Sequence, residues 1–201
     1  MTVPGSWDFK TTQWSLLTSD YVSAPSCLAT QIGGINYWRA LYRGTLCIPE
    51  GRMVGYWKTS NLGTGRPGFC FWSQAPVGAT TPVTEWRVDL HINGARMTRW
   101  YGGFSGVLYE FPLKWHPTSN VWYKVRVTWW YSCTSKNVRQ GCTSFDYWDG
   151  TAWVSLGTLK DIPGVENGSL INRCGVCADQ SPGSPAALCQ QDDTEIWVPA
   201  V

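Results

Sequence analysis

Residues 122–131, WYKVRVTWWY, carry the clearest β-strand pattern in the chain. Apolar side chains alternate with polar ones, and Val125, Val127 and Trp129 occupy every second position. Successive side chains of a strand point to opposite faces of a sheet. We therefore expect these three residues to be buried in a core and Arg126 to lie on the other face, as in an antiparallel sheet covered on one side.

The second face of this strand combines Trp122 and Trp130 with Lys124 and Arg126. Two indoles on one strand face would form an apolar patch that a soluble monomer seldom leaves bare. Three alternatives remain for what covers these indoles: a neighbouring subunit, the chain's own segment 162–191, or a sugar.

The same strand-like pattern recurs along the chain, for example over 86–93, and no stretch keeps the apolar periodicity of an amphipathic helix. Asn93-Gly94 and Asp149-Gly150 favour the turns of tight hairpins. We expect a single all-β domain over 1–201, in which the loop-rich segment 162–191 is a crossover packed on a sheet.

Composition narrows the class of protein. The 201 residues have a formal net charge of +2, and the 16 Lys and Arg are spread thinly. This is unlike the basic footprint of a nucleic-acid-binding protein. No apolar run reaches the ~18 residues of a membrane span, and the first residues do not resemble a signal peptide. We therefore expect neither nucleic acid nor membrane as a partner.

Eight dispersed cysteines suit disulfides formed outside a reducing cytosol, with free buried thiols as the alternative. Cys133 and Cys142 flank a short polar turn, and a disulfide between them is the pairing that we expect first. An oxidising environment without a signal peptide suggests a virion surface, and a mature secreted chain is the alternative. The expected localisation is therefore virion surface or extracellular.

Four segments resemble, in order, the strands of a concanavalin A-like, laminin-G-type jelly roll. They are YVSAPSCLAT (21–30), NVWYKVRVTWW (120–130), FDYWDGTAWVSLGTLKD (145–161) and DDTEIWV (192–198). The resemblance implies a two-sheet antiparallel sandwich with one concave face. It implies no single function, because this fold carries lectins, carbohydrate-binding modules, enzymes and virion proteins.

Polar faces of two predicted strands offer a glycan-binding surface or a subunit interface. If both strands belong to one concave sheet, aromatic rings would stack on sugars, polar groups would bind hydroxyls, and an arginine would suit an acidic sugar. The candidate residues are Arg87, Asp89, His91, Trp122, Lys124, Arg126 and Trp130.

Catalysis is not expected. The five glutamates are isolated, so a glycosidase carboxylate pair is not evident. Segments 37–39 (YWR), 89–91 (DLH) and 122–124 (WYK) partly resemble the catalytic strands of alginate-lyase jelly rolls. Asp89 replaces the glutamine of that pattern, which would oppose an acidic substrate.

A structural calcium ion is a further hypothesis, because jelly rolls often hold one through carboxylates near their paired termini. Asp192 and Asp193 open the last predicted strand, and Asp8 is the natural partner from the N-terminus. The alternative is a turn that leads into the strand. No other cofactor is expected.

These observations favour a non-catalytic virion surface protein, either a capsid decoration or a tail-associated module. It would assemble with itself or with other virion subunits, and glycan binding is a further expectation. The first alternative is a secreted carbohydrate-binding module or lectin, and the second is a polysaccharide lyase.

Overall fold

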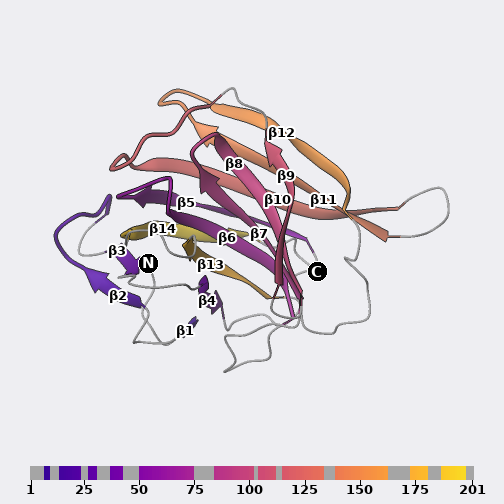
Figure 1. The fold of residues 1–201 in the computed structure, drawn as a ribbon. Helices are drawn as coiled ribbons and strands as arrows, with labels where there is room; N and C mark the ends of the chain where they lie inside the picture. The colour runs from indigo at the N-terminus through magenta and orange to yellow at the C-terminus, as the bar shows by residue number, and fades with distance from the viewer. Residues whose placement is uncertain are drawn as a thin grey trace.

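The computed structural model describes residues 7–9, 14–23, 27–30, 37–42, 50–74, 84–101, 104–111, 115–133, 139–162, 173–180 and 187–197. These residues form strands, turns and irregular segments, and none of them belongs to a helix that could cross a membrane. The strands build two antiparallel sheets, sheet A and sheet B, that stack as a sandwich (Figure 1). The predicted all-β, two-sheet jelly-roll architecture is confirmed.

The strand order of sheet A is β1–β4–β13–β6–β7–β8–β9. In that order they are β1 (Trp7–Phe9), β4 (Tyr37–Tyr42), β13 (Arg173–Gln180), β6 (Gly65–Ser73), β7 (Thr84–His91), β8 (Gly94–Tyr101) and β9 (Phe104–Phe111).

Sheet B has the order β12–β11–β10–β5–β14–β3–β2. Its strands are β12 (Trp153–Ile162), β11 (Arg139–Trp148), β10 (Tyr123–Cys133), β5 (Gly51–Thr59), β14 (Cys189–Trp197), β3 (Cys27–Thr30) and β2 (Trp14–Leu17). The pairs β10–β11, β11–β12 and β2–β3 are consecutive in the chain, whereas β5 and β14 pair with strands from distant parts of it.

The core lies between the sheets and is rich in aromatic rings. Val125, Val127 and Trp129 of β10 are fully buried in it, as predicted. The Trp129 ring stacks on Phe71 of sheet A with centroids 5.2 Å apart. Arg126 points to the opposite face, and a quarter of its side chain is exposed. The alternation of the strand therefore sets which side chains are buried.

The predicted Asp-Gly hairpin is confirmed between β11 and β12. Gly150 has a φ of +106°, a conformation that glycine adopts without steric cost. Asp149 Oδ1 accepts hydrogen bonds from the backbone N–H groups of Thr151 and Ala152, both at 2.8 Å. These bonds close the turn and fix the β11–β12 pairing.

The segment 162–191 differs from the predicted crossover. Residues 173–180 form β13, which pairs with β4 on one side and β6 on the other, inside sheet A. A Cβ atom at Gly175 would lie 2.1 Å from the carbonyl oxygen of Ala40. Such close approach favours the small residues of this strand, which made it look like a loop in the sequence. Residues 163–172 and 181–186 lie outside the described residues.

The predicted disulfide between Cys133 and Cys142 is not compatible with the strand register. Cys133 lies opposite Arg139, whereas Cys142 lies opposite Trp130. Positions 130 and 133 are three residues apart, so the cysteines are offset by about 10 Å along the strands. A disulfide needs Cα atoms within about 7 Å. Spacing around the turn suggested proximity, but the register separates the two residues.

Four of the other cysteines, Cys27, Cys174, Cys177 and Cys189, are buried free thiols. Burial raises the pKa of Cys174 and of Cys189 to about 12. Thiolate is the reactive form of cysteine. We expect these two thiols to resist Ellman's reagent at pH 8 in the native protein and to react fully in guanidinium. Peptide mapping of alkylated protein checks this, and rapid native labelling would contradict it.

The same two thiols give stability a pH dependence. In the unfolded chain a thiol loses its proton near pH 8.5, whereas the native thiols keep theirs until about pH 12. Between these values the native state binds more protons, so the free energy of unfolding falls as pH rises. Urea denaturation at pH 8 and pH 10 measures the change. The double variant Cys174→Ala/Cys189→Ala should show a smaller decline.

Candidate functional site

The two groups of predicted site residues lie on different sheets. Arg87, Asp89 and His91 belong to β7 of sheet A, and they alternate with core residues of that strand. The residues of the other group, Trp122, Lys124, Arg126 and Trp130, lie on or beside β10 of sheet B and likewise alternate with core residues. The faces that carry them point away from the core on opposite sides of the sandwich. The prediction that both groups share one surface is wrong. The alternation of polar and apolar residues shows which face of a strand is buried, but it does not show to which sheet the strand belongs.

The charged residues on the outer side of sheet A form a buried network. Asp89 is inaccessible to solvent and lies 2.8 Å from Arg96 and 3.6 Å from Arg87. Asp179 also contacts both arginines at 3.1 Å, and Arg66 at 3.4 Å. Arg87 and Asp89, which were candidates for ligand binding, are thus paired with other residues of the protein. The network therefore holds β6, β7, β8 and β13 together.

His91 lies at the edge of this network and is partly exposed. Burial lowers the pKa of its imidazole, and the positive charges of Arg96 and Arg66 lower it further. The imidazole is therefore neutral at pH 7. Its Nδ1 accepts a long hydrogen bond, 3.4 Å, from the backbone N–H of Asn93 in the adjoining turn.

The strands that resemble alginate lyases do not converge. Segments 37–39 and 89–91 belong to sheet A, whereas β10 with Tyr123 belongs to sheet B. Tyr123 packs against the core, with its ring edge-on to Trp115 at 5.1 Å. The third part of the lyase pattern is thus on the other sheet, away from His91.

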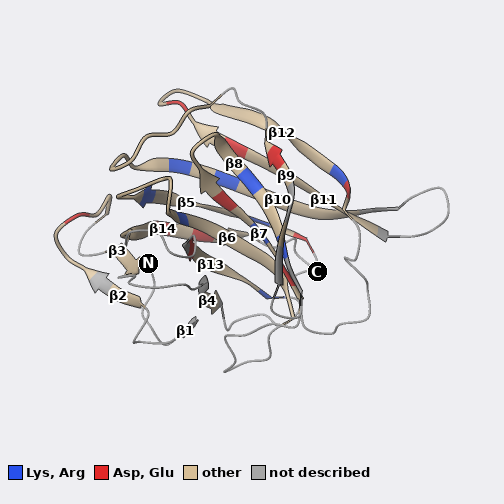
Figure 2. Ribbon diagram, in the orientation of Figure 1, with Lys and Arg blue, Asp and Glu red and all other residues tan. Residues whose placement is uncertain are grey.

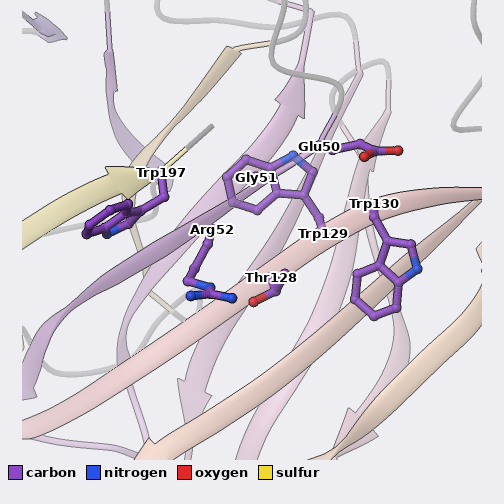
Figure 3. Close-up of a pocket in the computed structure, with 7 residues that line it drawn as sticks. All are labelled: Glu50, Gly51, Arg52, Thr128, Trp129, Trp130 and Trp197. Atoms are coloured by element: carbon purple, nitrogen blue, oxygen red, sulfur yellow. The ribbon is translucent and has the colours of Figure 1, made fainter. Parts of the chain in front are cut away.

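A groove opens on the outer face of sheet B (Figure 3). Register places Trp197 of β14, Arg52 of β5 and Thr128 of β10 side by side across three strands. Trp130 is the next outward-facing residue of β10, and Glu50 immediately precedes β5. Figure 3 shows the indoles of Trp197 and Trp130 on either side of Arg52 and Thr128.

The groove has a volume of about 350 Å³ and presents both apolar and polar groups. Trp197 is 59% exposed, and its Nε1 donates a hydrogen bond to Glu195 at 3.2 Å. Glu50 Oε1 accepts one from the backbone N–H of Tyr131 at 3.2 Å, which orients the carboxylate. Arg52 is exposed and has no ion-pair partner within the described part of the chain. The lining residues are Glu50, Gly51, Arg52, Thr128, Trp129, Trp130 and Trp197.

Sequence reasoning found Trp130 but missed Glu50, Arg52 and Trp197. A signal existed in β5, where Arg52 alternates with the buried Met53 just as the polar residues of β10 alternate with its core residues. The sequence of the final strand did not indicate that Trp197 lines the groove. Its position there follows from the pairing of β14 with β5.

The remaining predicted residues on or beside β10 contact other residues of the same chain. Trp122 Nε1 donates to Asp20 at 3.2 Å, and the ammonium of Lys58 lies 5.7 Å from the Trp122 ring centre. Lys58 also pairs with Asp20, and this hydrogen bond lowers the pKa of the Asp20 carboxyl. Lys124 lies over the ring of Tyr56. Intramolecular contacts thus cover part of this face, for which a subunit, the segment 162–191 and a sugar were the expected covers.

The predicted calcium ligands Asp8, Asp192 and Asp193 come from two different sheets. Asp8 belongs to β1 in sheet A, whereas Asp192 belongs to β14 in sheet B. Asp192 Oδ2 accepts hydrogen bonds from the backbone N–H groups of Val22 at 2.7 Å and Ser23 at 2.9 Å. Asp193 bonds the hydroxyl of Ser23. The described residues contain no cluster of three metal-ligating side chains. The two aspartates therefore lie within β14 and fasten residues 22–23 to it, whereas the alternative interpretation was a turn that leads into the last strand.

No family model matches the chain, and no curated protein sequence matches it. Solved structures do share its fold. The carbohydrate-binding module CBM66 from Bacillus subtilis aligns with a TM-score of 0.55 and 10% identity, over 96% of this chain and 95% of that one. Alginate lyase vAL-1 from Chlorella virus gives 0.60 and 11%, over 97% and 94%.

The exoplasmic/lumenal domain of VIP36, in its Ca²⁺/Man-bound form, aligns with a TM-score of 0.57 and 12% identity, over 98% of this chain and 84% of that one. At such low identities the likeness shows the fold alone. The chain therefore has a concanavalin A-like jelly-roll fold, a fold shared by binding modules, lectins and enzymes.

Proposed function

We propose that this protein binds a saccharide in the groove between Trp130 and Trp197. The observation that supports it is the pairing of two accessible indoles with three polar side chains of different hydrogen-bonding character. Indole faces stack on the apolar faces of sugar rings. Arg52 supplies donors, Glu50 supplies acceptors and Thr128 supplies both, which suits hydroxyl groups.

Binding fits this groove better than hydrolysis does. Glycoside hydrolysis ordinarily needs two carboxylates that face each other across the sugar. Glu50 is the only acidic side chain among the described residues that line the groove. Its carboxylate is also engaged by the backbone of Tyr131. These features support a binding module, whether the chain acts in a secreted protein or at a virion surface.

Replacing Trp197 by alanine is expected to weaken glycan binding roughly tenfold, because one stacking surface is lost. With 59% of the side chain exposed, the free energy of unfolding should change by less than about 0.5 kcal/mol. Affinity electrophoresis against xylan, mannan, β-glucan and alginate measures the effect. Ile92→Ala, at a 53% exposed position in the β7–β8 turn, is the control.

Two results would reject the proposal. One is that no polysaccharide retards the native protein. The other is that Trp197→Ala and Ile92→Ala bind alike. If Trp130→Ala and Trp197→Ala instead change the mass of the native complex and leave glycan retention intact, the groove is a subunit interface.

A further inference from the structure

A second pair of tryptophans lies on the outer face of sheet B, away from the groove. Trp148 and Trp153 oppose each other in the rung of the β11–β12 hairpin next to its turn. Their ring centroids are 5.6 Å apart at 67°. Trp148 is 37% exposed, and Trp153 is partly exposed. An accessible aromatic pair at this position is not explained by core packing.

Strand register fixes where this pair lies relative to the groove. Thr128 of the groove is opposite Ser144, and Trp148 lies four positions farther along β11, a distance of about 13 Å. Asp146, between them, is opposite Arg126. Residues two apart on a strand share a face, so all of these side chains lie on one surface. We call the surface from Trp197 through Thr128 and Arg126 to Trp148 the outer track.

The cation in the middle of the outer track is already neutralised. Arg126 Nε binds Asp146 at 2.8 Å, and its guanidinium lies 4.5 Å from the centre of the Trp153 ring. In the groove, Arg52 is accompanied by Glu50. Figure 2 likewise shows positive and negative residues interspersed over the described strands. The outer track thus carries side chains of both signs, with Lys124 and Arg126 on the same face as Asp146, rather than a uniformly basic surface. A polyanion gains less from such a mixed surface than from a basic one.

We propose that the groove is one end of the outer track and that the ligand is a neutral polysaccharide, bound along internal units of its chain. This inference rests on the proposed saccharide binding at Trp197. A polysaccharide that stacks in the groove would bring its next units close to Trp148. The second stacking contact would then form within an existing complex, which raises affinity through effective concentration. A single sugar cannot reach both platforms, so recognition of chain length follows.

Calorimetric titration with neutral oligosaccharides tests this. The probes are gluco-, xylo- and manno-oligosaccharides of two and of six units, with uronate hexasaccharides from alginate for comparison. In the series that binds, the hexasaccharide should bind at least roughly tenfold more tightly than the disaccharide. Trp148→Ala should reduce hexasaccharide affinity roughly tenfold and leave disaccharide affinity unchanged. Trp148→Phe keeps a stacking ring and should restore most of the loss.

The results separate this inference from the proposed function. If Trp197→Ala weakens binding but chain length and Trp148→Ala have no effect, the groove binds sugars and the outer track is wrong. Tighter binding of the uronate hexasaccharide than of any neutral one would overturn the ligand class. If Trp197→Ala has no effect on any probe, the proposed function itself fails. Thermal unfolding of each variant confirms that the fold is retained.

Discussion

Replacing Trp129 by alanine is expected to lower the free energy of unfolding by about 3–5 kcal/mol. The side chain is inaccessible to solvent and joins the two sheets by stacking on Phe71. Gly51 on the adjacent strand leaves room for the ring, since a Cβ atom there would lie 2.7 Å from it. The truncated side chain would leave a cavity that the surrounding sheets can close only in part.

Trp130 provides the matched control, because it is the same residue type at the next position of the same strand. Its side chain points to the groove and is only partly buried. Trp130→Ala should therefore cost much less stability than Trp129→Ala. Equilibrium denaturation in urea, followed by circular dichroism, measures both. A loss below about 1 kcal/mol for Trp129→Ala would mean that the two faces of β10 are assigned the wrong way round.

The substitution Asp89→Ala is expected to have a comparable effect, about 3–5 kcal/mol, for an electrostatic reason. Asp89 is fully buried between Arg87 and Arg96. Removing its carboxylate leaves two buried guanidinium groups that depend more heavily on Asp179. Burying a charge without sufficient compensation costs more than the ion pair itself contributes.

Asp146→Ala is the control for this prediction. Asp146 also pairs with an arginine at 2.8 Å, but a quarter of the Arg126 side chain is exposed. Water can solvate Arg126 once its partner is lost, so the expected cost is nearer the ~1 kcal/mol of exposed ion pairs. Equal losses for Asp89→Ala and Asp146→Ala in urea denaturation would show that the sheet A network is not a buried support of the fold.

The sequence alone determined the properties that depend on neighbouring residues. Alternation over residues 122–131 identified Trp129 as core and Arg126 as outward-facing. Asp149-Gly150 identified a hairpin, because few residues adopt the positive φ of that turn. Both signals arise from the two-residue period of a strand and from local backbone sterics, so no distant contact was needed to read them.

Tertiary structure alone decided which strands are neighbours. The glycine- and cysteine-rich β13 looks like a loop in the sequence, yet it lies between β4 and β6, where Gly175 lets its backbone approach Ala40 closely. The three-residue offset of Cys133 and Cys142 and the meeting of Arg52 with Trp197 follow from strand register. Register and sheet membership depend on contacts between segments far apart in the chain, and local alternation is the same whichever partner a strand acquires.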